Sequence, residues 1–332
     1  MSLIEGKDIL VTGGCGSIGS EIVRQVLKHN PKRLRVFDHS ESGHFNLNQS
    51  MGKTSVIRNL IGDVRDAPRI ERAMQGVDMV FHASALKHVP FCEYNPYEAV
   101  HTNVIGTKNV VEAAIQNGVQ KVVAISTDKA VGPVNTMGAT KLLSEKIVIN
   151  APVGESTAKF ACVRFGNVLD SVGSVIPIWR HQIEHGEPVT VTSDEMTRFF
   201  MTIPQAANLI LQAADQMNGR EIFVLKMFGL RILDLAEVMI QELAPKYGRK
   251  PEDIEIDIIG VRPGEKLGEA LFTDMERPHV TETEHMFVIR NSPYDTFIPN
   301  HDAEFSNYNS ANMKLLNKDQ VRDMLYRNNI LT

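Results

Sequence analysis

The chain has 332 residues, a formal net charge of −5 and a pI near 6.1, which is enough length for one large or two closely joined domains with a buried core. Its lysines and arginines are scattered, and its three cysteines are too few for a disulfide framework or a metal clip. It shows neither a signal peptide nor a bilayer-spanning run of roughly 20 apolar residues. We therefore expect a cytoplasmic protein with no nucleic-acid partner, no metal site and no membrane insertion.

Apolar segments of strand length alternate with helical patterns through the first half of the chain. Strands are predicted at 9–12, 34–37, 55–60, 79–82, 122–125 and 160–164, and helices at 18–28, 96–116 and 137–149. This alternation is typical of a doubly wound parallel sheet. We predict an α/β fold of the Rossmann type, with a smaller C-terminal α/β lobe that binds the substrate.

Past residue 165 the elements become shorter and less regular. Helices are predicted after Pro204, around 236–243 and at 318–326, whereas 291–312 is polar and predicted to be an irregular arm. We divide the chain into a Rossmann domain at 1–165, to which later segments return, a second lobe at 166–290, and an arm with a terminal helix at 291–332.

A glycine-rich turn joins the first predicted strand to the first predicted helix. Its glycines allow the backbone and the positive end of the helix dipole to meet a pyrophosphate. The second strand ends at Asp38, about 20 residues farther on, where a carboxylate binds ribose hydroxyls and repels a 2′-phosphate. The pattern predicts NAD as the cofactor, and the alternative is a turn that only packs the helix on the strand. The residues of the turn are Gly13, Gly16, Ser17, Ile18 and Gly19.

Two further strand ends fall at the same edge of the predicted sheet, where open α/β sheets bind ligands. Asp63 and Val64 follow the third strand, and Ala83, Ser84 and Ala85 follow the fourth. The alanines allow close approach of the backbone to the cofactor. Asp63 is a candidate to receive the adenine amino group, or else it is a capping or turn residue.

Seven later motifs add a more specific signal. They are LKHVP at 86–90, STDKA at 126–130, MGATK at 137–141, RFGNV at 164–168, GSVIP at 173–177, MTRF at 196–199 and RPGEK at 262–266. With the glycine turn they resemble the extended short-chain dehydrogenase/reductases. More narrowly, the sequence is similar to the nucleotide-sugar 4,6-dehydratases of polysaccharide biosynthesis that act on UDP-N-acetylglucosamine, over roughly residues 5 to 275.

The resemblance implies a hydro-lyase reaction that is redox-neutral overall and uses NAD. The sugar is oxidised at C4, water leaves across C5 and C6, and the hydride returns to C6. The product is a UDP-2-acetamido-2,6-dideoxy-4-keto-hexose for glycan or polysaccharide synthesis. Segments 16–21 and 37–41 resemble the branch that retains the configuration at C5 and whose larger relatives carry a membrane-spanning N-terminal region. We therefore expect retention.

The resemblance also implies the catalytic roles. Asp128 is the acid for the C6 hydroxyl and Lys129 the base for the C5 hydrogen, so we expect a turn that brings both to one sugar. Thr127 binds near O4, and Lys141 binds the nicotinamide ribose. The alternatives are an ion pair that caps the strand and a solvated helix lysine.

Met137 departs from the broad superfamily, which carries at this position a tyrosine that removes the hydroxyl proton. A thioether cannot take that proton usefully. A subset of these dehydratases also reads Met-x-x-x-Lys, so we expect Asp128 or Lys141, acting through Thr127 and a water, to handle the O4 proton. The alternative is an inactive enzyme.

A UDP-sugar needs cations, amides and a flat apolar slot in its pocket. The resemblance assigns the diphosphate and the ribose to Asn167, Arg198, Arg262 and Glu265, the sugar to Lys87, His88 and Ser126, and the uracil slot to Ser174, Val175 and Pro177. The alternatives are surface ion pairs for the arginines and a core position for His88.

Two other functions remain open at this point. A UDP-sugar 4-epimerase has the same fold, cofactor and oxidation step, but it normally needs the missing tyrosine and has no use for an acid and a base at 128 and 129. A non-catalytic NAD-binding interaction protein would explain Met137. The dehydratase accounts for more of the polar residues, and its relatives imply a homo-oligomer.

Overall fold

A nine-stranded sheet with the order β13-β14-β10-β6-β5-β4-β1-β2-β3 dominates the structure, a computed structural model that describes residues 3–52, 54–152, 154, 157–290, 305 and 308–331. Its parallel strands are β1 (Asp8–Thr12), β2 (Arg33–Asp38), β3 (Ile57–Ile61), β4 (Met79–His82), β5 (Lys121–Ile125), β6 (Lys159–Arg164) and β10 (Ile222–Leu225). Strands β14 (Met286–Ile289) and β13 (Val280–Glu282) extend it in antiparallel fashion. The predicted doubly wound parallel sheet is confirmed.

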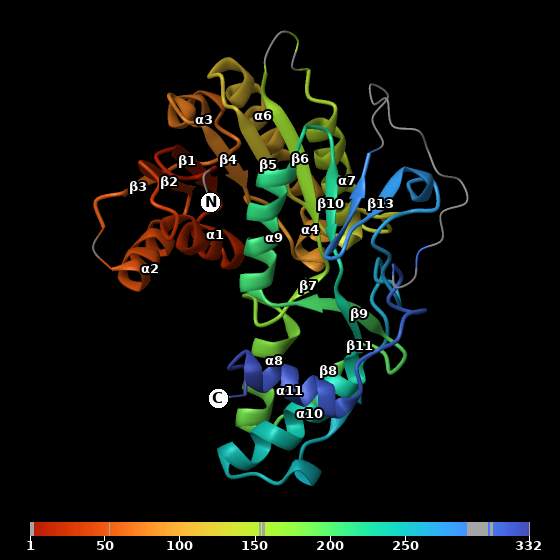
Figure 1. Cartoon of the computed structure of the whole chain (residues 1–332). Coiled ribbons are helices and arrows are strands. Elements are labelled where there is room, and N and C mark those ends of the chain that lie inside the picture. Colours follow the sequence, from red (N-terminus) through yellow and green to blue (C-terminus); the bar gives the residue numbers. More distant parts are fainter. Residues whose placement is uncertain are drawn as a thin grey trace.

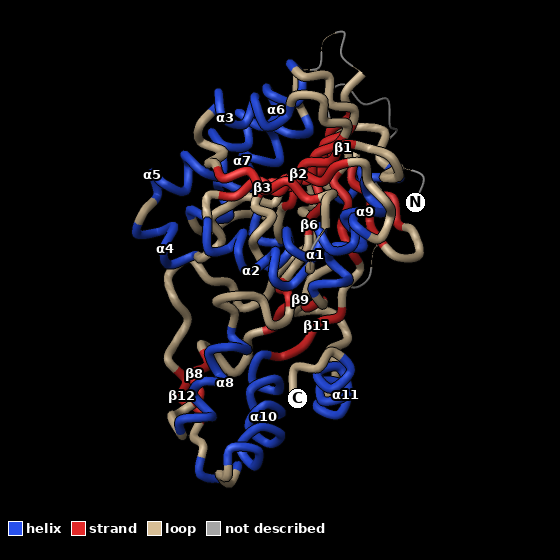
Figure 2. The backbone as a smooth tube through the Cα atoms, turned by 90° about the vertical axis from the view of Figure 1, so that its left-hand side faces the viewer, coloured by secondary structure: helices blue, strands red, loops and turns tan. Residues whose placement is uncertain are grey.

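Helices cover both faces of this sheet (Figures 1 and 2). Helices α1 (Ser17–Leu27) and α9 (Ile203–Gln216) pack together on one face, and α3 (Ala67–Met74), α6 (Gly106–Gln116) and α7 (Thr136–Ile149) lie on the other. The sheet is therefore buried on both sides, which explains why its central strands are continuously apolar.

Helix α9 illustrates how the sequence sets an element's start. Thr202 and Gln205 form a reciprocal capping box, and a proline stands in the first turn.

The predicted helix at 96–116 is interrupted. It consists of α5 (Pro96–Ala99), a π-helix at Val100–Ile105 and α6. Within the π-helix the Asn103 side chain accepts from Leu86 N at 2.8 Å and donates to Leu86 O at 3.0 Å and to Thr140 Oγ1 at 2.9 Å. The irregular turns thus fix the chain that follows β4 against α7.

A smaller lobe lies below the sheet in Figure 1. It has one sheet of β7 (Asn167–Val168), β9 (Thr197–Met201) and β11 (Phe228–Arg231), and another of β8 (Val189–Val191) and β12 (Ile256–Ile258). Its core gathers Trp179, Leu235 and Leu325 from α8 (Val175–His185), α10 (Ile232–Leu243) and α11 (Lys318–Arg327). Helices α9, α10 and α11 coincide with the helices expected after residue 203.

Several elements lie outside the predicted ones: α2 (Glu41–Met51), α3, α4 (Val89–Tyr94), α8 and short 3₁₀ turns at Ala244–Tyr247, Pro251–Asp253 and Arg277–His279. Segments 203–225 and 280–289 run back into the large sheet from beyond residue 165. Most of the predicted arm at 291–312 falls outside the described residues. None of the helices that the structure describes is long and apolar enough to span a membrane.

His82, at the end of β4, is buried between two hydroxyl groups. Thr12 Oγ1 lies 2.7 Å from its Nδ1, and Thr107 Oγ1 lies 3.1 Å from its Nε2. Burial, and next the charge of Lys141, lowers the pKa of His82 from 6.5 to about 3. The folded protein therefore keeps this ring neutral in mild acid, where the unfolded chain protonates it.

We expect the free energy of unfolding to fall as the pH drops from 6.5 towards 3, by up to about 1.4 kcal/mol per pH unit from His82. Urea titrations across this range measure the slope. His82→Gln should flatten it, whereas His285→Gln, at an exposed ring, should not. Equal slopes in all three proteins would show that His82 is not responsible.

Candidate functional site

The glycine turn lies at the point where the strand order of the large sheet reverses, between β1 and β4. A Cβ on Gly13, whose φ is +65°, would lie 2.6 Å from the backbone nitrogen of Ser84, and a Cβ on Gly19 would overlap the Gly13 carbonyl. Among the described residues no side chain caps α1, which begins after Gly16. The turn is thus a close backbone cradle with helix N–H groups that are available to an anion.

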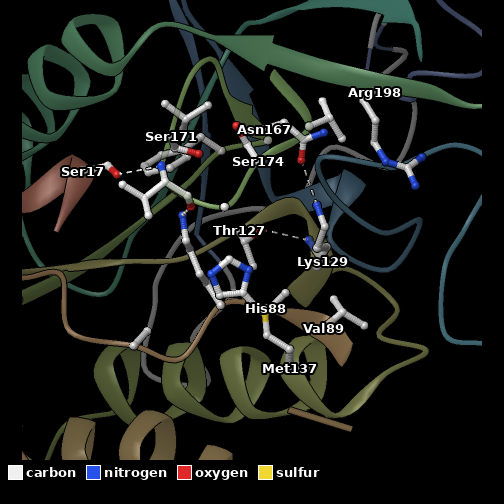
Figure 3. A pocket seen from close by; sticks show the side chains of 18 of the residues that line it. Ser17, His88, Val89, Thr127, Lys129, Met137, Asn167, Ser171, Ser174 and Arg198 are labelled. Atoms are coloured by element: carbon white, nitrogen blue, oxygen red, sulfur yellow. Dashed lines mark hydrogen bonds between the residues drawn. The ribbon is translucent and has the colours of Figure 1, made fainter. Parts of the chain in front are cut away.

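A cavity of about 770 Å³ extends from this turn to the smaller lobe (Figure 3). The predicted site residues that line it are Gly13, Gly16, Ser17, Ile18, Gly19, Ala83, Ala85, Lys87, His88, Ser126, Thr127, Lys129, Met137, Lys141, Asn167, Ser174, Val175, Arg198, Arg262 and Glu265. Those that do not are Asp38, Asp63, Val64, Ser84, Asp128 and Pro177. The fold therefore brings together residues from opposite ends of the chain.

Asp38 and Asp63 have different surroundings. The Asp38 carboxylate accepts from Cys15 N at 3.1 Å and from Ser40 N at 3.0 Å, so it lies beside the glycine turn. Asp63 accepts from the backbone N–H and the guanidinium of Arg65, at 2.9 and 2.6 Å. Burial would raise the pKa of Asp63, but Arg65 outweighs it and the pKa is lowered. These contacts show Asp63 as a turn residue, the alternative given above. Its contact with the adenine amino group stays a prediction.

Three other predicted residues lie behind the cavity wall. Val64 is buried under Gly106, where a Cβ would lie 2.7 Å from Val64 Cγ2, so its side chain packs in the core. Ser84 presents its backbone to Gly13, and Pro177 lies within α8. Pro177 does not line the cavity, and its uracil contact stays a prediction.

The expected turn after β5 is present as the 3₁₀ helix that begins at Asp128. Thr127 Oγ1 and Lys129 Nζ both donate to Asp128 Oδ1, at 2.9 and 3.0 Å. Lys129 Nζ also donates to Asn167 Oδ1 at 3.2 Å (Figure 3). Asp128 is fully buried, whereas Thr127 and Lys129 line the cavity. The carboxylate therefore faces the cavity only through these two neighbours.

Helix α7 positions Met137 and Lys141. Its first residue follows Asn135, whose Oδ1 accepts from Gly138 N at 2.7 Å and whose Nδ2 donates to Gly264 O at 2.8 Å. Lys141 Nζ donates to Ile125 O at 2.6 Å, and burial lowers the pKa of Lys141. Because Lys141 is buried, the alternative of a solvated helix lysine is wrong.

The arginines on the far side of the cavity are not used in ion pairs. Arg198 Nη1 donates to the carbonyls of Thr197 and Leu267, at 2.8 and 3.1 Å. Arg262 is exposed at the rim, and its backbone N–H donates to Glu265 at 3.3 Å. Within the described ranges neither guanidinium contacts a carboxylate, so both keep their charge available for an anion.

Lys87 and His88 form the loop after β4. Lys87 Nζ donates to Val172 O at 2.8 Å, and burial lowers the pKa of Lys87. His88 is partly exposed and meets Phe91 edge-on, with ring centroids 5.9 Å apart. Burial, and then the charge of Lys87, lowers the pKa of His88. His88 therefore lines the cavity rather than the core.

The sequence reasoning missed several lining residues, among them Phe165, Ser171, Trp179, Thr192 and Glu269. Glu269 is the most notable because it is an acid only 4% exposed. The sequence feature that could have identified Glu269 is its position three residues after Lys266, at the end of the RPGEK motif.

Comparison with known proteins places the chain in a family. The polysaccharide biosynthesis protein family matches residues 9–291. An uncharacterized membrane protein of Methanocaldococcus jannaschii is 54% identical over 96% of this chain and 95% of its own. A UDP-N-acetylglucosamine 4,6-dehydratase (inverting) of Campylobacter jejuni is 38% identical over 87% and 84%.

Two further comparisons concern length and structure. The capsular polysaccharide biosynthesis protein CapD of Staphylococcus aureus is 48% identical over 82% of this chain, which spans only 46% of CapD. The X-ray structure of Pen from Bacillus thuringiensis superposes with a TM-score of 0.94, at 43% identity and 99% coverage of both chains. The resemblance predicted from the motifs is thereby confirmed, and the chain belongs to the polysaccharide biosynthesis protein family.

Proposed function

We propose that this protein is an NAD-dependent UDP-N-acetylglucosamine 4,6-dehydratase that serves glycan or polysaccharide synthesis. The observation that carries the proposal is the hydrogen-bonded set Thr127–Asp128–Lys129, which opens into the cavity beside the glycine turn. The Campylobacter relative carries this activity in its name.

The glycine turn fits NAD. The cradle at Gly13 and Gly19 leaves no room for side chains, Asp38 lies beside it for the adenosine ribose, and Lys141 reaches the cavity for the second ribose. When bound, NAD supplies the oxidation at C4 and the later reduction at C6.

The hydroxyl of Thr127 takes the place of the missing tyrosine. As the sugar O4 gives its proton to Thr127 Oγ1, the Thr127 proton passes along the 2.9 Å hydrogen bond to Asp128 Oδ1, so one proton leaves the sugar and one arrives at the carboxylate. Met137 lines the cavity and takes no part in this transfer. The relay develops the expectation that Asp128 acts through Thr127.

The same proton then serves the elimination. The 4-ketone acidifies the hydrogen at C5, which the amine of Lys129 accepts, while Asp128 returns its proton through Thr127 to the departing C6 hydroxyl. Lys129 later gives its proton back to C5. Asn167, through its 3.2 Å contact, holds the amine in place and keeps its own Nδ2 for the diphosphate, beside Arg198 and Arg262.

Incubation of the protein with UDP-N-acetylglucosamine in deuterated water tests the proposal. Mass spectrometry should show the loss of one water, and NMR should show one deuterium at C5. Denaturation should release NAD that ultraviolet absorption identifies. We propose retention at C5, and the ring couplings will distinguish it from the inversion in the name of the Campylobacter relative.

The UDP-sugar 4-epimerase remains the second candidate. A UDP-glucose 4-epimerase of Rickettsia rickettsii is 38% identical over 96% of this chain. Met137 and the Asp128–Lys129 contact favour the dehydratase. Unchanged mass with formation of the 4-epimer would establish the epimerase, and no turnover with any UDP-hexosamine would favour a non-catalytic NAD-binding protein.

We also propose that the chain self-associates through the surface of α4 and α5. Phe91, Tyr94 and Tyr97 are 71%, 87% and 70% exposed there, which is unusual for three neighbouring aromatic side chains. Phe91→Glu combined with Tyr94→Glu should convert an oligomer to a monomer in size-exclusion chromatography with light scattering. Phe45→Glu, at a 63% exposed ring on α2, is the control and should leave the mass unchanged.

A further inference from the structure

Two carboxyl groups beside the cavity each have one oxygen that accepts no hydrogen bond from the residues that the structure describes. Asp128 Oδ2 and Glu269 Oε2 are shielded from solvent and have no hydrogen-bond partner among the residues that the structure describes. Their side chains belong to residues that are 0% and 4% exposed. An unpaired buried polar atom costs free energy, so two of them in one region require a physical explanation.

Strand β9 brings these two groups to the same region. Gly166 packs so closely on β9 that a Cβ on it would also lie 3.1 Å from Asp128 Oδ2. Thr197, the first residue of β9, donates to Leu267 O at 2.9 Å and so holds the segment that carries Glu269 against the same strand. The two acids thus come from segments that both pack on β9, with Asp128 fully buried and Glu269 in the cavity wall.

The charged groups that face Glu269 come from three segments. Asp128 and Lys129 belong to the 3₁₀ turn after β5, Arg198 belongs to β9, and Lys266 lies on the same segment as Glu269, with Nζ 3.8 Å from Oε2. Burial first, and then the negative charge of Asp128, raises the pKa of Glu269 against the opposing effect of the three cations. The surroundings therefore favour a protonated Glu269.

We propose that Glu269 is a positioning residue that holds a proton between its Oε2 and Asp128 Oδ2. One proton then satisfies both buried oxygens, and Asp128 Oδ1 stays free for Thr127 and Lys129. The reaction neither consumes nor releases this proton. The inference rests on the role proposed for Asp128, but the shared proton itself exists without substrate.

Infrared spectroscopy of the purified protein, with no substrate added, tests for the proton directly. A pH titration should show a protonated-carboxyl C=O band that persists above the ordinary range of glutamic acid and disappears in Glu269→Gln. Glu195→Gln, at an exposed carboxyl on the loop before β9, is the matched control and should leave the band unchanged. Persistence of the band in Glu269→Gln would overturn the proposal.

Kinetics give a second, independent readout. Glu269→Gln still donates a hydrogen bond to Asp128 but cannot ionise, so it should lose the fall in kcat that wild type shows at alkaline pH. Glu269→Leu removes the donor and should lower kcat about 10- to 100-fold below Glu269→Gln, the value of one hydrogen bond to a charged group, with KM little changed. Coincident pH profiles of wild type and Glu269→Gln would contradict a shared proton.

The outcomes separate this inference from the proposed function. If dehydration occurs but the band is absent, Glu269 is merely an ion-pair partner of Lys266 and only this inference fails. If the band is present and lost in Glu269→Gln, while UDP-N-acetylglucosamine is not dehydrated, the shared proton stands and the proposed substrate is wrong. Thermal melting of each variant confirms that it is folded.

Discussion

Asp128→Asn should lower kcat about 10²–10⁴-fold, the usual value of a general acid–base group, without loss of bound NAD. The amide keeps the size of the carboxylate and can still accept from Thr127, but it cannot take up the proton that O4 releases. Because Asp128 does not line the cavity, KM for UDP-N-acetylglucosamine should change little. Steady-state kinetics and the NAD content of the denatured variant provide the measurement.

Asp66→Asn is the matched control for this prediction. Asp66 caps α3 through a 3.0 Å bond from Arg69 N, and asparagine caps a helix as well as aspartate does. Its kcat should equal that of wild type. Near-normal turnover by Asp128→Asn would eliminate the carboxylate as the proton acceptor and would move that role to Lys141.

Arg164→Met should lower the free energy of unfolding by about 3–5 kcal/mol, because it leaves two buried carboxylates without the guanidinium that pairs with them. Arg164 is fully buried and donates to Glu145 at 2.7 and 3.0 Å and to Glu276 at 3.1 and 3.2 Å. Burial alone would raise the pKa of Glu276, but the charge and hydrogen bonds of Arg164 outweigh it and lower that pKa. Urea unfolding at pH 7 measures the loss, which should shrink in acid as the carboxylates protonate.

Two variants test the origin of this loss. Arg322→Met removes surface ion pairs with Glu242 and Asp319, both at 2.7 Å, and should change the free energy of unfolding far less than Arg164→Met does. The triple variant Arg164→Met, Glu145→Leu, Glu276→Leu should recover most of the stability, because no charge stays buried. A triple variant as unstable as Arg164→Met would mean that packing, not charge, accounts for the effect.

Much of the fold was predictable because the strands of a parallel sheet are apolar along their whole length. Segments 9–12 and 79–82 show this, and β1 and β4 occupy them. Helix α2 lacks such a signal, since only His44 and Leu47 of its residues are buried. The π-helix depends on contacts between Asn103 and Leu86, which are 17 residues apart, so no local pattern predicts it.

The part of the site that could be predicted consists of residues at strand ends and in the sequence motifs. The turn at Asp128 follows from the need of two adjacent side chains to reach one region. The burial of Asp128 and the approach of Glu269 are set by the packing of β9 against segments far away in sequence, and no pattern of residues announces that. The pairing of Arg65 with Asp63 could not be predicted either. The two residues are only two positions apart, but their contact depends on the direction of the side chains.

The path of the chain between its two cores limits how the molecule can open. The polypeptide passes from one core to the other after β6, after β9, after β10, before β13 and again before α11. Several tethers in parallel restrict the rotation of one half against the other more than a single linker does. We therefore expect a ligand to enter and leave by rearrangement of side chains and short loops at the rim of the cavity. Crosslinking the two halves at a distance from this rim should leave the turnover rate intact.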